Sequence, residues 1–315
     1  MAAVFSHRVT EGLFSLLRIG LGSDEAMAPL TDAEWKSLQT LAAQQSVIGI
    51  VYAGVSRLPE DFPVPDDVTL QLMAEASRIR KRSALVAGVL AKVKEQFNDP
   101  IVLKGPAVAA FYPEPELRES GDLDLYFPDL KAAPTAPDGS SHLNIDGIDI
   151  DIHRSYFDLR LRPAVEIPSP EATLLMLSAH ILKHAFSSGT GLRQICDIAL
   201  AYRSLEYDEA ALKALWKECG LVKWNNLLSA FIREHLGVQA LLISEGEDTG
   251  KLLSIVLEGG NFGHFAADRR KALEASAASR KTDTLKRLLQ KAPFGLSYAP
   301  GKYLGYIFSL TKGNL

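Results

Sequence analysis

Residues 121–127 read Gly-Asp-Leu-Asp-Leu-Tyr-Phe, and residues 148–153 read Ile-Asp-Ile-Asp-Ile-His. In both stretches aspartate alternates with an apolar residue, and a period of two is that of a β-strand. The apolar side chains therefore enter a core on one face, while Asp122 and Asp124 share the other face about 7 Å apart. Two such strands predict a small β-sheet with an acidic polar face.

Paired carboxylates on one strand face predict a cation site, because they repel each other unless a cation lies between them. If the two strands are neighbours, Asp149 or Asp151 completes a cluster for Mg²⁺ or Mn²⁺, which prefer oxygen ligands. Solvated aspartates on an exposed edge are the alternative. Acidic residues outnumber basic ones over residues 104–158, and this excess favours the divalent cation.

The order of these residues resembles the nucleotidyltransferase superfamily that includes DNA polymerase β and the aminoglycoside nucleotidyltransferases. An apolar run ends in Lys104-Gly105, a short helix is expected next, and the Asp-x-Asp strand and a later aspartate follow. More narrowly, residues 100–200 resemble a bacterial family of uncharacterised nucleotidyltransferases. The motifs that carry this resemblance are Leu103-Lys-Gly105, Tyr112-Pro113, Leu117-Arg-Glu-Ser-Gly-Asp-Leu-Asp124, Asp151-Ile-His153 and Ser169-Pro-Glu171 followed by His180 and His184.

The resemblance implies a magnesium-dependent transfer of a nucleoside monophosphate from a nucleoside triphosphate, such as ATP, to a hydroxyl group. The acceptor would be a small molecule, a sugar, or a peptide or protein. Asp122 and Asp124 match the metal-binding pair. Asp151 matches the third catalytic and metal-binding carboxylate, which helps to activate the attacking hydroxyl; Asp149 is its rival.

Nucleotide binding departs from the superfamily pattern. The usual Gly-Ser, which holds the triphosphate, is replaced here by Lys104-Gly105-Pro106, so a lysine would neutralise a phosphate instead. A planar arginine fork can bind phosphate oxygens in a bidentate way, and glycines can let the backbone approach a ligand closely. The predicted nucleotide-binding residues are Lys104, Gly105, Arg118, Gly121, Lys183 and His184.

Two other functions remain open at this stage. The missing serine is compatible with a catalytically inactive nucleotide- or ligand-binding module of the same fold. The acidic cluster is also compatible with a metal-dependent phosphodiesterase. His180 and His184 have a helical spacing compatible with zinc, but no glutamate follows His180 as in a metalloprotease. We therefore expect this helix to pack on the core or to line the active cleft.

Composition limits the remaining possibilities. The chain has 315 residues, 47% hydrophobic residues and a net charge of −4, which disfavours a dedicated nucleic-acid binder. The longest apolar run, residues 47–55, is about half of what a membrane span needs, and we find no secretion signal. We thus expect a cytoplasmic protein in which Cys196 and Cys219 are reduced thiols, and leave the oligomeric state open.

Hydrophobic periodicity predicts an α+β fold with a small mixed β-sheet flanked by N-terminal and C-terminal helical regions. The resemblance implies that this sheet is a nucleotidyltransferase core. We expect three parts, an N-terminal helical region (1–98), the catalytic core (99–160) and a C-terminal helical region (161–315) that lines the acceptor pocket. Capping signatures at Thr31-Asp-Ala-Glu34 and Ser169-Pro170 mark two helix starts. The predicted helices are 8–20, 32–58, 66–97, 105–112, 208–220, 223–236 and 265–291, and the predicted strands are 100–103, 122–127, 141–145 and 148–154.

Overall fold

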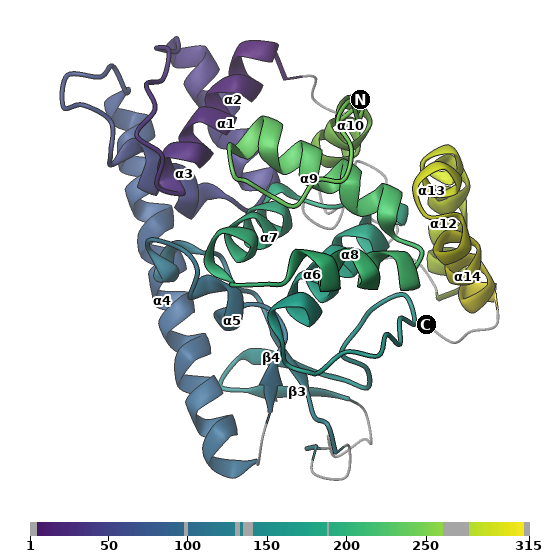
Figure 1. The fold of residues 1–315 in the computed structure, drawn as a ribbon. Helices are drawn as coiled ribbons and strands as arrows, with labels where there is room; N and C mark the ends of the chain where they lie inside the picture. The colour runs from purple at the N-terminus through teal and green to yellow at the C-terminus, as the bar shows by residue number, and fades with distance from the viewer. Residues whose placement is uncertain are drawn as a thin grey trace. The chain divides into compact units, whose positions relative to one another are not determined.

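A computed structural model describes residues 5–97, 100–129, 133–134, 141–187, 189–260 and 277–311, and the side chains of all of these except 277–283 and 311. The chain forms two compact units. The N-terminal unit contains Phe5–Ala43 and Val47–Tyr156, and the C-terminal unit contains Gln44–Ser46 and the chain from Phe157 onward (Figure 1). Helices dominate, with one small mixed sheet, as the predicted α+β class requires. The predicted three-part division stays a prediction.

Four helices open the N-terminal unit: α1 (His7–Gly20), α2 (Asp32–Gln44), α3 (Ile48–Val55) and α4 (Asp66–Gln96). The predicted capping box before α2 is confirmed, because Thr31 N donates to Glu34 Oε2 at 2.9 Å and Glu34 N donates back to Thr31 Oγ1 at 3.4 Å. Gly49 in α3 is required by packing, since a Cβ there would lie 1.9 Å from the carbonyl oxygen of Leu117.

The prediction of one continuous helix over 32–58 is wrong. The helix breaks at Gln45–Val47, where Ser46 has a φ of 53°, outside the right-handed helical region. Gln45 belongs to the C-terminal unit, in which its side chain accepts from Leu192 N at 3.0 Å and donates to Val256 O at 2.9 Å. Buried backbone groups need partners, so these tertiary hydrogen bonds outweigh local helix propensity.

The sheet has four strands in the order β1-β2-β4-β3. Their bounds are β1 Ile101–Val102, β2 Leu123–Tyr126, β3 His142–Ile145 and β4 Ile148–His153. β2 and β4 are parallel, while β1 and β3 pair antiparallel on the two outer sides. Each predicted strand is therefore present. The predicted helix 105–112 is shorter, because α5 spans only Pro106–Ala109, and a 3-10 helix η1 follows at Pro115–Leu117. The α conformation is disfavoured for the residue before a proline, here Tyr112 before Pro113.

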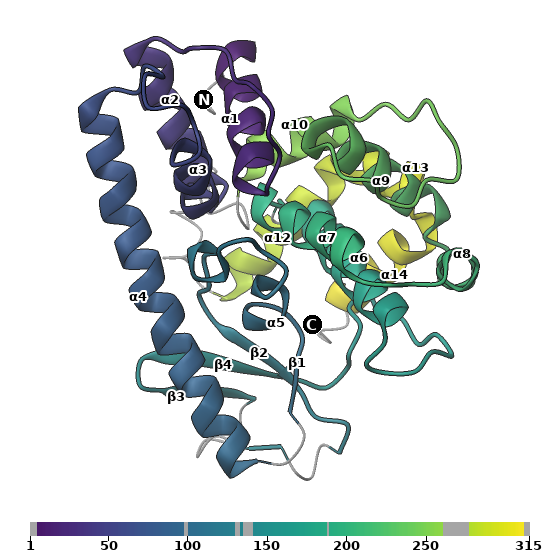
Figure 2. The ribbon, with the colours of Figure 1, turned by 60° about the vertical axis from the view of Figure 1, so that its left-hand side comes forward.

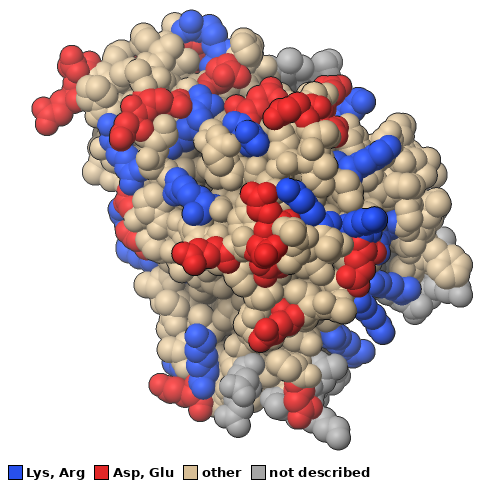
Figure 3. Space-filling model, viewed as in Figure 1, with Lys and Arg blue, Asp and Glu red and all other residues tan. Residues whose placement is uncertain are grey.

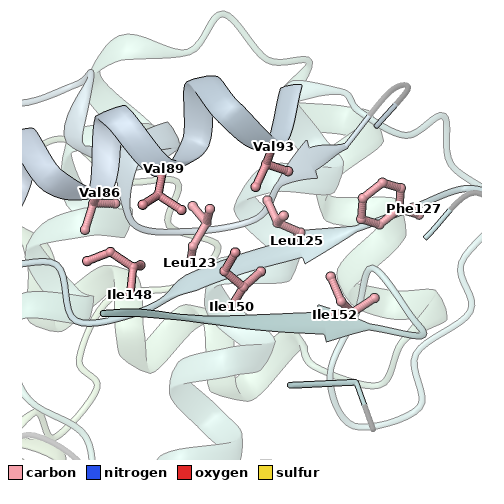
Figure 4. Close-up of a cluster of buried hydrophobic side chains, with 9 residues drawn as sticks. All are labelled: Val86, Val89, Val93, Leu123, Leu125, Phe127, Ile148, Ile150 and Ile152. Carbon is pink, nitrogen blue, oxygen red and sulfur yellow. The ribbon is translucent and has the colours of Figure 1, made fainter. Parts of the chain in front are cut away.

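One face of the sheet is covered by the C-terminal half of α4, which runs beside β3 and β4 in Figure 2. Figure 4 shows the valines of α4 facing the leucines and isoleucines of β2 and β4. Burying each such side chain contributes about 1.5–3 kcal/mol relative to leaving it exposed. The residues of this core are Val86, Val89, Val93, Leu123, Leu125, Phe127, Ile148, Ile150 and Ile152. Because side chains alternate across a strand, the aspartates of β2 and β4 lie on the opposite face.

The turn between β3 and β4 consists of Asp146 and Gly147, with φ values of 51° and 77°. Positive φ at both central residues is the type I′ hairpin geometry, for which Asp-Gly is a preferred sequence. A two-residue turn fixes the register, so that His142 pairs with Asp151 and Asn144 with Asp149.

The C-terminal unit is helical in its described residues. Ser169 caps its first helix as predicted, accepting from Ala172 N at 3.1 Å. Cys196 and Cys219 are buried free thiols. Of the predicted helix 265–291, residues 277–290 form a helix and residues 265–276 lie outside the described part. The helices are α6 Pro170–Phe186, α7 Leu192–Ser204, α8 Glu209–Glu218, α9 Val222–Leu236, α10 Gly250–Gly259, α12 Ala277–Gln290, α13 Ala292–Tyr298 and α14 Pro300–Thr311.

The surface carries charges of both signs. Lysine and arginine are interspersed with aspartate and glutamate over much of the face in Figure 3. Across the described residues, every helix is too short or too polar to cross a bilayer.

Candidate metal centre

Three carboxylates converge on the face of the sheet opposite α4 in the N-terminal unit. Asp124 and Asp151 are direct partners in the parallel register of β2 and β4, and Asp122 immediately precedes β2. One carboxylate oxygen from each of the three lies within 4.8 Å of the others. The sequence analysis assumed that the two acidic strands are neighbours, and the pairing of β2 with β4 confirms it.

Asp124 is the buried member of this cluster, with 7% of its surface exposed. Its Oδ1 accepts from Lys104 Nζ at 3.0 Å and from His153 Nε2 at 2.6 Å. Burial alone would raise the pKa of Asp124, but the charge of Lys104 and the hydrogen bond from His153 outweigh burial and hold that pKa well below its usual range. Asp124 is therefore an anion that already binds cationic or donor groups.

The two aspartates of β4 have different partners. Asp151 is half-exposed and hydrogen bonds with His142 Nδ1 across the β3–β4 pair. Asp149 accepts from Asn144 Nδ2 at 2.7 Å, and Asn144 Oδ1 accepts from Gly147 N at 3.1 Å. Asp149 thus joins the network that braces the hairpin turn, whereas Asp151 joins the cluster with Asp122 and Asp124.

The Lys104-Gly105 turn lies against the backbone of Asp122. Gly105 has a φ of +61°, and a Cβ there would lie 3.6 Å from Asp122 O. Glycine is required at this turn by its backbone conformation more than by the space around it. Gly121 differs, because a Cβ there would meet no atom within 4 Å among the described residues. Packing against a neighbouring protein atom therefore does not explain the glycine at position 121. The close approach of its backbone to a ligand stays a prediction.

Arg118 is almost completely buried, with 5% of its surface exposed. Its Nη1 donates to Glu119 O at 2.9 Å and to Ser120 Oγ at 3.1 Å. Through these bonds Arg118 holds the loop that leads to Asp122. Its predicted contact with phosphate stays a prediction.

Arg82 of α4 is a residue of this site that the sequence did not reveal. Its Nη2 donates to Gly121 O at 2.6 Å and its Nη1 to Gly147 O at 3.1 Å. No local pattern marks a helix side chain that reaches two loop carbonyls. His142 was also missed, although the Asp-Gly turn could have placed it opposite Asp151, because a two-residue hairpin defines every cross-strand pair.

Lys183 and His184 lie on α6 of the C-terminal unit. Lys183 Nζ donates to Asp158 Oδ1 at 2.7 Å, and His180 Nδ1 hydrogen bonds with Asp158 Oδ2 at 2.9 Å. The rings of His180 and His184 are 4.5 Å apart. Burial would raise the pKa of Asp158, but the hydrogen bond from His180 and the charge of Lys183 hold it well below its usual range. Neither histidine belongs to a group of three metal-ligating side chains within the described residues, so the argument for zinc gains no support.

The donor set of the carboxylate cluster fits a small divalent cation. Mg²⁺ binds oxygens at about 2.0–2.1 Å, so opposite ligands of an octahedron are about 4.2 Å apart. The three carboxylate oxygens lie within 4.8 Å of one another, which is close to this distance. All three candidate ligand atoms are hard carboxylate oxygens, a donor set that favours Mg²⁺ or Mn²⁺.

A cavity of about 820 Å³ lies in the same unit, bounded by α2, α3 and α4. Its lining combines amide and hydroxyl groups, such as Gln39, Thr40 and Gln71, with charges of both signs. Glu119 forms part of its wall and lies three residues before Asp122. Three extended residues span at most about 11 Å, which limits the backbone separation between Glu119 in the cavity wall and Asp122.

Comparison with known protein families assigns a class to this arrangement. A family described as uncharacterised nucleotidyltransferase matches residues 31–136 and 143–237, more than half of the chain, including all three carboxylates. The protein is therefore a nucleotidyltransferase by family. It belongs to this uncharacterised nucleotidyltransferase family, and no curated protein and no solved structure matches it significantly.

Proposed function

We propose that this protein is a metal-dependent nucleotidyltransferase whose catalytic core, related to that of DNA polymerase β, lies in the N-terminal unit. The observation that carries the proposal is the convergence of Asp122, Asp124 and Asp151 from two parallel strands. A mixed sheet with a Lys-Gly turn before its Asp-x-Asp strand, and the family match, support it. The proposed reaction moves a nucleoside monophosphate from a nucleoside triphosphate to an acceptor hydroxyl, with pyrophosphate as the leaving group.

Each carboxylate has a separate proposed role. Asp122 and Asp124 hold Mg²⁺ or Mn²⁺, which when bound offsets the charge that develops on the phosphate oxygens. Asp151 joins them and orients the attacking hydroxyl, whose proton it can accept. His142 supports Asp151 by fixing the rotamer of its carboxylate.

Lys104 is proposed to exchange partners during binding. Its ammonium pairs with Asp124 Oδ1, and a divalent cation bound to the same carboxylate would repel the ammonium. Once displaced from Asp124, the ammonium can neutralise a phosphate of the nucleotide. It would then replace the serine that helps to hold the triphosphate in the superfamily pattern. The other predicted nucleotide ligands, Arg118, Gly121, Lys183 and His184, stay predictions.

The acceptor is proposed to be a polar molecule that bears a hydroxyl group. The cavity between α2 and α4 offers amide and hydroxyl partners, and Glu119, three residues before Asp122, forms part of its wall. The C-terminal helical region, residues 161–315, is the second proposed source of acceptor contacts.

Two aspartates of one strand give a matched test. Asp151→Asn should abolish Mn²⁺-dependent binding of a non-hydrolysable ATP analogue, measured by calorimetry, because it removes one of three ligands. Asp149→Asn should leave that binding within about twofold of the wild type, since Asp149 binds Asn144 instead. Equal effects of the two substitutions would contradict the proposed metal site.

Calorimetry and product analysis separate the two alternative functions. An inactive binding module would bind the nucleotide without a metal, or would bind no nucleotide. A phosphodiesterase would release a hydrolysed product instead of an adduct, which mass spectrometry of the reaction distinguishes.

A further inference from the structure

Asp122 is the one of the three carboxylates that lies outside the paired strands. It precedes β2, is exposed, and takes no part in the ladder that fixes Asp124 opposite Asp151. Its position depends on the loop 118–122 and on what holds that loop.

The loop is held at two points by arginines. Arg118 binds Glu119 O and Ser120 Oγ from within the loop itself. Arg82 binds Gly121 O, the carbonyl directly before Asp122, from outside the loop. The second arginine therefore ties the loop to α4.

Arg82 also binds the hairpin that carries Asp151. Its other terminal nitrogen donates to Gly147 O in the β3–β4 turn, one residue before β4 begins. One planar guanidinium thus bridges the backbone before Asp122 and the backbone before β4. A guanidinium presents its donors in a fixed fork, so the two carbonyls are held at a set separation.

The base of this bridge is rigid. Arg82 is four residues before Val86, the first of three α4 valines buried against β2 and β4. Lys92, further along α4, forms an ion pair with Asp146 in the same hairpin turn. Arg82 therefore projects from a helix that is itself fixed to the sheet.

We infer that Arg82 is a positioning residue of the metal centre, which sets Asp122 from the loop before β2 against Asp151 from β4. The inference rests on the proposed metal-dependent function. In this role Arg82 acts on Asp122 through the backbone of Gly121. Groups that orient metal ligands in this way typically change metal affinity by about 10–100-fold when removed.

The test measures Mn²⁺ affinity by electron paramagnetic resonance in the full-length protein. Arg82→Ala should weaken Mn²⁺ binding at least about tenfold and broaden the signal of the bound ion, while the thermal midpoint changes little. Arg82→Lys keeps the charge but has no planar fork to bridge two carbonyls, and should show an intermediate loss. Arg82→Gln is the second variant should the alanine variant fold poorly.

Two controls on the same helix isolate the bridge. Arg78→Ala removes an exposed guanidinium that pairs with Glu75, and Lys92→Ala removes the other tie to the hairpin without touching Gly121. Arg78→Ala should bind Mn²⁺ as the wild type does, and Lys92→Ala should weaken Mn²⁺ binding less than Arg82→Ala, because the bond from Arg82 to Gly121 O remains. A folded Arg82→Ala with unchanged Mn²⁺ affinity would overturn the inference. A wild-type protein that binds no Mn²⁺ would overturn the proposed function instead.

Discussion

Replacing Lys104 by methionine removes the ammonium that pairs with Asp124 and keeps a side chain of similar length at position 104. The ammonium and the carboxylate are 3.0 Å apart, and their side chains are only 14% and 10% exposed. At an effective dielectric constant of about 20, their attraction is about 5.5 kcal/mol. Desolvation of the two groups offsets part of this, and His153 remains as a partner of Asp124. We therefore expect Lys104→Met to lower the free energy of unfolding by about 3 kcal/mol.

Urea unfolding in EDTA and in Mn²⁺ measures this effect. A ligand at 100 times its dissociation constant stabilises the native state by about 2.7 kcal/mol. Mn²⁺ should stabilise Lys104→Met more than the wild type at equal concentration, because no ammonium competes for Asp124. Lys36→Met is the matched control. Its ion pair with Asp67 is 62% and 54% exposed, so it should cost less than about 1 kcal/mol.

Two outcomes would refute this reasoning about Lys104. A loss below about 1 kcal/mol in EDTA would mean that the ion pair is no stronger than a surface pair. Greater stabilisation of the wild type than of Lys104→Met by Mn²⁺ would mean that Lys104 assists the cation instead of competing with it.

Further substitutions probe the two units separately. Because His180 and Lys183 depress the pKa of Asp158, this carboxyl stabilises the protein above its unfolded pKa of about 3.8, and the stability is lost as the pH falls below that value. Asp158→Asn should cost about 2 kcal/mol at pH 7 and reduce the acid dependence, as measured by urea unfolding at pH 7 and pH 3; an unchanged acid dependence would contradict this. Gly49→Ala should cost at least about 2 kcal/mol, because its Cβ would lie 1.9 Å from a carbonyl oxygen of η1, whereas Gly88→Ala in open space on α4 should be neutral or stabilising by thermal unfolding. Equal effects of the two alanines would refute the packing argument.

The sheet and its acidic face were predictable because both depend on local alternation. Leu123, Leu125 and Ile150 enter the core on the face that the period of two requires. The helix starts at Thr31 and Ser169 were predictable for the same reason, since a cap involves only residues close in the sequence.

Interactions between distant segments were not predictable in this way. Arg82 is separated by 39 residues from Gly121 and by 65 from Gly147, and no pattern within α4 indicates either contact. The break at Ser46 likewise depends on partners of Gln45 that come 147 and 211 residues later. Sequence periodicity reports which face of an element is buried, but not which polar group will meet a given side chain.

The register of β4 determines two properties at once. A shift by one residue against β2 would turn Ile150 and Ile152 away from α4 and direct Asp151 into the apolar core. Such a misregistered chain would lose its core and its carboxylate cluster together. A misfolded but compact form with an intact metal site is therefore strongly disfavoured, and metal binding by this protein would report that its sheet has assembled correctly.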